Sequence, residues 1–201
     1  TIELLSIIRK CDEFWKNSHN ENIDEFTNKA IKILKSDKLF VLRVSDFNTI
    51  GLQGAFDTES ITPWVGLVKS TGVNVKNNGV AAGSYGIGKA AAFVNSDLQT
   101  VFYRTKDLEG NIAAQGVANL MAFIDESYGD EDPVRRATGF YGNPIKNVPV
   151  DKFEQLDVIY KRSEVGTDVF IPGFHWVTVG AKSWVEIMTG EILENFLIDR
   201  K

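Results

Sequence analysis

The chain has 201 residues, of which 43% are hydrophobic and 24% are charged, so it can bury a core of its own and fits one globular domain. Its net charge of −5 leaves no basic footprint, and we expect no direct nucleic-acid binding by this chain. No apolar run approaches the roughly 20 residues that a membrane span needs, and a single cysteine excludes an intrachain disulfide, so we expect a cytoplasmic protein.

Two amphipathic helices are predicted before the first strand. Residues 2–16 place apolar side chains at i, i+3, i+4 and i+7, and Cys11 lies on that face, where we expect a buried residue and not a nucleophile. After a polar break, Asn22 and Glu25 have the spacing of a capping box at the start of the second helix.

The first predicted strand is the apolar run 39–44, which ends at Asp46 and enters a turn that reaches Gly51. Residues 54–82 are then rich in Gly, Ser, Thr, Asn and Val, with little periodicity. A stretch of this length is usually a functional lid, and the alternative is a flexible surface loop. We expect Trp64 and the turn at 61–63 to anchor one part of it.

A glycine-rich loop leads into a run of small, helix-favouring residues. It consists of Gly83, Ser84, Tyr85, Gly86, Ile87, Gly88 and Lys89. Glycines let backbone N–H groups approach an anion, and a helix N-terminus adds about half a positive charge, so the loop can cradle phosphates. It fits neither a P-loop, because Ala90 replaces the hydroxyl that binds Mg²⁺, nor a Rossmann fingerprint, because no apolar strand precedes it. A loop that only turns the chain, and a lysine that serves only solubility, remain alternatives.

The second half of the chain predicts mainly β structure. Residues 98–105 and 112–123 form a predicted hairpin, and the acidic run 125–132 is expected to be a solvated loop and not a metal site. Further predicted elements are a short strand at 138–142, a hairpin whose strands are 153–160 and the segment with Gly166 and Thr167, and a C-terminal helix at 181–199 with Val185, Met188, Ile192 and Phe196 on its apolar face. Together the elements predict one α+β two-layer sandwich, with a mixed, mostly antiparallel sheet and helices on one face.

Three of these motifs, in this order, resemble the GHKL ATPase superfamily of gyrase, histidine kinases, a heat-shock chaperone and the MutL proteins. They are the strand that ends at Asp46 with Gly51 after it, the loop 83–89, and the later Gly166-Thr167 strand. The sequences S-D-F-N-T-x-G-L, G-S-Y-G-I-G-K and L-x-T-V-F-Y are more narrowly similar to bacterial ATP-binding proteins of this superfamily.

The resemblance implies that the chain binds ATP with Mg²⁺. Asp46 would accept a hydrogen bond from the adenine amino group, Gly51 would permit close backbone approach, and Thr167 would support the base. The amides of 83–88 and Lys89 would hold the phosphates within an ATP lid over 54–90. A helix behind the sheet, slow ATP hydrolysis in the intact protein, and a conformational switch that acts on a partner or a second copy are also implied.

The chain departs from the superfamily pattern in two places. The first motif, a helix with a Glu that activates water and an Asn that holds Mg²⁺, has no counterpart in residues 1–38. We therefore expect a fragment whose catalytic residues lie upstream of Thr1, with 1–38 as a helical insertion. The turn after Asp46 is one residue longer than usual, and Asn48 stands near the place of the first glycine.

Two other functions stay open. One is an interaction domain that keeps the fold without productive ATP use, which both departures favour. The other is a phosphotransferase like the histidine kinases, although nothing in the chain resembles their dimerisation helix.

Overall fold

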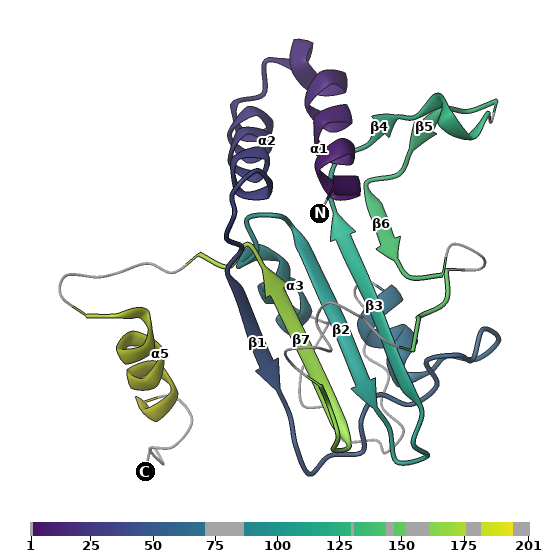
Figure 1. Ribbon diagram of the computed structural model, residues 1–201, viewed down its shortest axis with the longest axis vertical. Helices are drawn as coiled ribbons and strands as arrows, with labels where there is room; N and C mark the ends of the chain where they lie inside the picture. Colours follow the sequence, from purple (N-terminus) through teal and green to yellow (C-terminus); the bar gives the residue numbers. More distant parts are fainter. Residues whose placement is uncertain are drawn as a thin grey trace.

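A five-stranded antiparallel sheet forms the centre of the molecule and is seen face-on in Figure 1. The computed structural model describes residues 2–70, 87–129, 131–143, 147–151, 161–175 and 182–194. The strand order is β1-β7-β2-β3-β6, and the strands are β1 (Val41–Ser45), β2 (Thr100–Lys106), β3 (Ile112–Asn119), β6 (Thr138–Tyr141) and β7 (Gly166–Pro172). An antiparallel sheet with helices packed against it confirms the predicted α+β class.

The remaining elements are helices, short helical turns and one small ribbon. They are α1 (Ile2–Trp15), η1 (Lys16–Ser18), α2 (Glu21–Leu34), η2 (Val65–Lys69), α3 (Ile87–Val94), β4 (Phe123–Ile124), η3 (Glu126–Tyr128), β5 (Val134–Arg135) and α5 (Trp184–Ile192). None of the helices in the described ranges has the length and apolar character that crossing a bilayer requires.

The predicted hairpin is confirmed by β2 and β3, which pair over their whole length. Asp107 fixes the turn between them, because its Oδ1 accepts hydrogen bonds from the backbone N–H groups of Glu109 at 3.0 Å and Asn111 at 2.8 Å. A carboxylate that bonds to nearby backbone in this way stabilises a tight turn. The short strand predicted at 138–142 is also present, as β6. The other predicted hairpin strand, 153–160, lies outside the described residues.

One face of the sheet carries the main core, and α3 and η2 cover it. Side chains alternate between faces along a strand, so Val101 and Tyr103 of β2 share this face. Phe93 of α3, Trp64 and Val68 pack onto them in one buried cluster. In Figure 1, α3 and the helical turn after residue 62 lie behind the sheet. We call this side the helix-covered face.

The expectation that Trp64 and the turn at 61–63 anchor one part of residues 54–82 is confirmed within residues 54–70. Trp64 is completely buried, and the Thr62 hydroxyl donates to the Gly54 carbonyl at 3.1 Å while accepting from the Val65 N–H at 3.2 Å. One large aromatic side chain and one local hydroxyl therefore anchor the segment, and neither produces a periodic pattern in the sequence. Residues 71–82 lie outside the described residues.

The helices α1 and α2 pack against each other and stand at one end of the sheet (Figure 1). Ile8 and Ala30 form a small buried cluster with Leu98, just before β2. Trp15 Nε1 donates to the Ala122 carbonyl at 2.7 Å, which ties α1 to the chain beside β4. Cys11 is completely buried, as the sequence predicted.

The start of α2 differs from the predicted capping box. Asn20 is the N-cap: its backbone is extended, with φ −94° and ψ 102°, and its side chain accepts from the Asn22 N–H at 3.1 Å. The helix therefore begins at Glu21, and the prediction that Asn22 and Glu25 form the cap is wrong. Asparagine is a strong N-cap wherever its backbone is extended, and Asn20 meets that condition two residues earlier.

The C-terminal helix α5 does not bury its apolar face, in contrast to what the resemblance implied. Val185, Met188 and Ile192 are 52%, 39% and 45% exposed, and no described residue of α5 is buried. The Trp184 ring of α5 lies edge to face with the Phe174 ring, which follows β7. Figure 1 accordingly shows α5 to one side of the sheet. Phe196 lies outside the described residues.

Trp64→Ala should lower the free energy of unfolding by about 3–5 kcal/mol, because it opens a cavity in the main core. Trp184→Ala is the matched control, and we expect about 1 kcal/mol or less from the loss of one aromatic contact. Chemical denaturation of both variants measures the difference. If both variants lose the same free energy of unfolding, Trp64 does not anchor residues 54–70 in the core.

Candidate functional site

The structure brings Asp46 and Thr167 together at one corner of the sheet. Asp46 directly follows β1, and Thr167 lies near the start of its neighbour β7, 121 residues later. The Asp46 N–H donates to the Thr167 carbonyl at 3.0 Å, and the Thr167 N–H donates to Asp46 Oδ1. Two residues that the motifs linked only by resemblance are therefore direct hydrogen-bond partners.

The turn after Asp46 packs onto the end of β2. Thr49 Oγ1 donates to Asp46 Oδ1 at 3.1 Å, and Asn48 has a left-handed backbone with φ 57°. Gly51 has φ +67°, and a Cβ there would lie 2.4 Å from the Lys106 carbonyl oxygen. Glycine is needed at this position because the turn lies against the backbone of β2. Whether Gly51 also approaches a ligand stays a prediction.

Asp46 keeps one carboxylate oxygen available. Both of its side-chain hydrogen bonds, from Thr167 and Thr49, end on Oδ1, and Oδ2 accepts none from any residue in the described ranges. The side chain is exposed. This corner can therefore accept a hydrogen bond from a donor outside the chain, with the carboxylate already fixed through its other oxygen.

Arg162 binds the same corner and was not identified from the sequence. Its Nη2 donates to the carbonyl oxygens of Asp46 at 2.9 Å and Thr167 at 3.0 Å. Its guanidinium also lies 5.0 Å from the centre of the Phe47 ring. At Gly166, with φ +143°, a Cβ would lie 2.5 Å from Asp46 Oδ1 and 2.6 Å from Arg162 Nη1, so the corner has no room for a side chain there.

Asp168, the residue after Thr167, is completely buried and binds three arginines. Arg162 Nη2 lies 2.8 Å from Asp168 Oδ1, Arg104 Nη2 lies 2.9 Å from Oδ2, and Arg43 Nη2 lies 3.0 Å from Oδ1. The Ser45 hydroxyl also donates to Oδ1 at 2.7 Å. Arg43 comes from β1, Arg104 from β2 and Asp168 from β7, so the cluster joins three strands on the face opposite the helix-covered one. We call these residues the Asp168 cluster.

The hydrogen bonds of the Asp168 cluster decide the charge of its carboxyl group. Burial by itself raises the pKa of Asp168, but the donors Arg162, Ser45, Arg104 and Arg43 outweigh burial and hold the pKa well below its ordinary value. Asp168 is therefore ionised in the folded protein under all ordinary conditions. A buried carboxylate of this kind is stable only while its partners remain in place.

The sequence does contain a signal for the Asp168 cluster. Arg43 and Arg104 stand inside strands that are otherwise apolar or β-branched, and Asp168 lies between Thr167 and Val169 of β7. Charged residues in buried strand positions need partners, so such positions predict pairing with one another. Arg162 gives no such signal, because it lies outside the strand.

The glycine-rich loop is only partly described. Gly83, Ser84, Tyr85 and Gly86 lie outside the described residues, whereas Ile87, Gly88 and Lys89 form the first turn of α3. Lys89 Nζ donates to the Ser70 carbonyl, and burial lowers the pKa of Lys89. In this structure Lys89 therefore ties α3 to the end of the segment anchored by Trp64. Phosphate binding by the loop and Lys89 stays a prediction.

The described residues hold no group of three or more His, Cys, Asp or Glu side chains that could bind a metal ion. The acidic run 125–132 accordingly uses its first carboxylate in other ways: Lys10 Nζ lies 2.8 Å from Asp125 Oδ1, and the Ser127 N–H also donates to that oxygen. No family model, curated protein or solved structure matches the chain. The resemblance therefore depends on the motifs and on the geometry that joins Asp46 to Thr167.

Asp168→Asn should lower the free energy of unfolding by about 3–5 kcal/mol, because it leaves buried guanidinium groups without their carboxylate. Asp37→Asn is the matched control at an exposed carboxylate, and we expect a change within about 0.5 kcal/mol. Urea denaturation of both variants measures these changes. Similar small losses would mean that the Asp168 cluster adds little to stability.

The free energy of unfolding should also depend on Asp168 in acid. The folded-state pKa of Asp168 lies below its unfolded value of about 3.9, so its contribution is fully present above that pH and is lost as the pH falls toward the folded pKa. Below about pH 4 the difference between the wild type and Asp168→Asn should narrow by up to about 1.4 kcal/mol per pH unit. Urea denaturation at several pH values measures it, and a constant difference down to pH 2 would contradict the lowered pKa.

Proposed function

We propose that the chain is the ATP-binding domain of a GHKL-type ATPase, which acts as a nucleotide-driven conformational switch in a cytoplasmic bacterial protein. The observation that supports this best is the position of Asp46. Thr167 and Thr49 hold its Oδ1, while Oδ2 accepts no hydrogen bond from the described residues. A fixed carboxylate with one available oxygen suits recognition of a single amino group.

Adenine carries such a group. Its exocyclic amino group is a donor at the position where guanine presents a carbonyl acceptor, so a carboxylate at this place favours adenine. Thr167 lies on the same face of the sheet as Tyr103, the helix-covered face, because it pairs with Thr105 of β2. A base bound at Asp46 would thus lie beside the Thr167 side chain, whose hydroxyl can bond to it directly or through water.

The phosphates are assigned to the glycine-rich loop on the resemblance. Backbone amides of 83–88 would hold them, and Lys89 would reach them after leaving the Ser70 carbonyl. Mg²⁺ usually binds through phosphate oxygens and one or two carboxylates, and no residue of the described chain is assigned to it. ATP hydrolysis likewise has no residue in this chain that we assign to water activation.

A non-catalytic interaction domain is the second candidate. The exposed apolar residues of α5 favour it, because they offer a contact surface, and so does Lys89, whose ammonium group is engaged with Ser70. In this case the fold would be retained and ATP would not bind. A partner protein, or a second copy of the chain, would then be the ligand.

Asp46→Asn should weaken Mg-ATP binding by about 10- to 100-fold, the size expected for a hydrogen bond to a charged group. Asparagine can still accept from Thr167 and Thr49 through Oδ1, but its NH₂ then faces the adenine amino group, donor against donor. Calorimetric titration of the 201-residue chain with Mg-ATP and Mg-GTP measures the change. We expect the wild type to prefer ATP and the variant to lose that preference.

Asp37→Asn serves as the control, since it makes the same substitution at an exposed carboxylate ahead of β1. It should bind Mg-ATP as the wild type does. If the wild type does not bind Mg-ATP, or if Asp46→Asn binds it as tightly as the wild type does, the nucleotide proposal fails. A non-catalytic interaction domain is then the better-supported function.

A further inference from the structure

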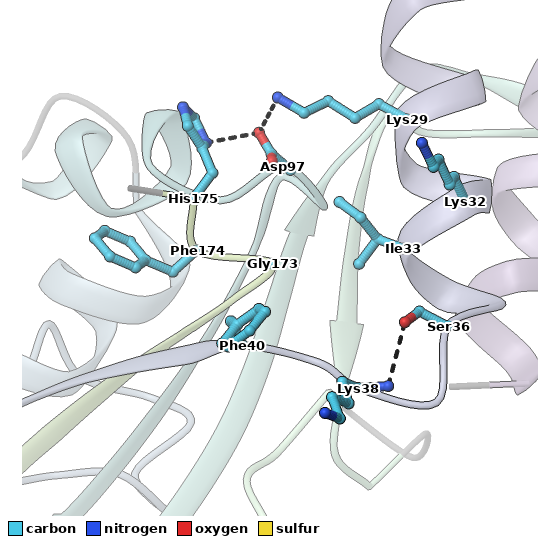
Figure 2. A pocket seen from close by; sticks show the side chains of 10 residues that line it. All are labelled: Lys29, Lys32, Ile33, Ser36, Lys38, Phe40, Asp97, Gly173, Phe174 and His175. Carbon is cyan, nitrogen blue, oxygen red and sulfur yellow. Dashed lines mark hydrogen bonds and ion pairs between the residues drawn. The ribbon is translucent and has the colours of Figure 1, made fainter. Parts of the chain in front are cut away.

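A separate hollow lies at the opposite end of β1 and β7 from Asp46, and Figure 2 shows it. Its volume is about 480 Å³. The second half of α2, residues 36–40 between α2 and β1, the loop before β2 and the residues after β7 line it. None of the residues predicted to bind ATP is among them.

Backbone hydrogen bonds fix the floor of the hollow. The Gly173 N–H donates to the Phe40 carbonyl at 2.9 Å, and the Asp97 N–H donates to the Gly173 carbonyl at 3.0 Å. The Ser96 hydroxyl, which is buried, donates to the Pro172 carbonyl at 2.6 Å. Three distant segments of the chain are therefore held together here, and the hollow is formed before any ligand binds.

The hollow gathers positive charge. Lys29, Lys32 and Lys38 line it, against one acidic side chain, Asp97. Asp97 Oδ1 lies 2.8 Å from both Lys29 Nζ and His175 Nδ1. Within the described ranges, the ammonium groups of Lys32 and Lys38 have no carboxylate partner. A local excess of cations on a chain with a net charge of −5 suits an anionic ligand.

An aromatic ring lies among these cations. Phe40 is 56% exposed, and Figure 2 shows its ring between Lys38 on one side and Phe174 and His175 on the other. Exposed aromatic rings beside lysines are typical of sites that stack a base and hold its phosphate. Lysine binds phosphate as a compact point charge.

We propose that this hollow binds one nucleotide unit, with the base on Phe40 and the phosphate on Lys32 and Lys38, whose side chains point apart in Figure 2 and turn toward the phosphate when it binds. A hollow of about 480 Å³ has the size of a small-ligand pocket and suits one nucleotide, not a duplex. A free mononucleotide and a nucleotide of a single strand present the same chemistry. The acidic net charge does not oppose this, because at physiological salt charges interact only over about 8 Å.

The test uses uridine monophosphate and a 5′-phosphorylated tetrauridylate with the 201-residue chain. Uracil has no exocyclic amino group, so these probes cannot use the proposed adenine contact of Asp46. The chain has two histidines, and His19→Gln leaves His175 as the only one, so its ring signal in NMR reports binding at the hollow itself. Titrations of this signal give the affinity of each probe.

The double variant Lys32→Gln/Lys38→Gln should bind uridine monophosphate at least tenfold more weakly. Lys35→Gln is the matched control, because Lys35 is exposed at the end of the same helix but does not line the hollow. Lys35→Gln and Asp46→Asn should both bind within twofold of the wild type. Tighter binding of the tetrauridylate would indicate a single strand as the ligand, and equal binding would indicate a free nucleotide.

Three results would overturn the proposal. They are no shift of the His175 signal with either probe at millimolar concentration, an equal loss in Lys35→Gln, and equal affinity for inorganic phosphate and uridine monophosphate. Failure of the ATP proposal is recognised separately, by titration with Mg-ATP, because that proposal depends on Asp46 at the other end of the strands.

Discussion

One buried carboxylate, Asp168, holds three strands of the sheet and the segment before β7 in a single arrangement. Arg43, Arg104 and Arg162 reach it from β1, from β2 and from outside the sheet. Such a cluster adds little net stability over an apolar core of the same size, but removing one member leaves a buried charge without its counterpart. Separating these strands would therefore leave buried charges without their partners, which is a large cost.

The position of Asp46 follows from that constraint. The Arg162 guanidinium donates hydrogen bonds both to the Asp168 carboxylate and to the carbonyl oxygens of Asp46 and Thr167. The corner of Asp46 and Thr167, where we propose that the base binds, is thus built on paired strands and held by a buried side chain, which is how a preorganised site is usually supported. Lys89 differs, because it would have to leave the Ser70 carbonyl to reach a phosphate. Binding of phosphates would accordingly be coupled to movement between α3 and the segment that Trp64 anchors, whereas binding of the base would not.

The sequence predicted the parts of the fold that depend on local patterns. The β2–β3 hairpin, the strand before Asp46 and the burial of Cys11 all follow from alternation or helical spacing, and the structure confirms them. Arg162 could not be predicted in this way, and for Trp64 the sequence indicated an anchor but not the residues against which it packs. Each takes its role from contacts with residues far away in the sequence, and a segment without periodicity does not identify those partners.

The exposure of α5 has the same kind of cause. The spacing of its apolar residues in the sequence shows that this helix has an apolar face. The spacing does not show which surface, if any, covers that face. The Asp46–Thr167 pair is an intermediate case. Alternation could not join two residues 121 positions apart, but the resemblance placed both at one site, and the pairing of β1 with β7 brings them into contact.

The same two strands carry both proposed sites, and this decides how the sites relate to each other. Five consecutive pairs, from Val41 with Pro172 to Ser45 with Asp168, separate Phe40 and Gly173 from Asp46 and Thr167. At about 3.3 Å per residue, the six steps from Phe40 to Asp46 place the two ends roughly 20 Å apart, too far for one small ligand to reach both. The Asp168 cluster also reinforces the ladder between them at its Asp46 end. The geometry therefore favours two independent sites on one rigid support over a single extended site.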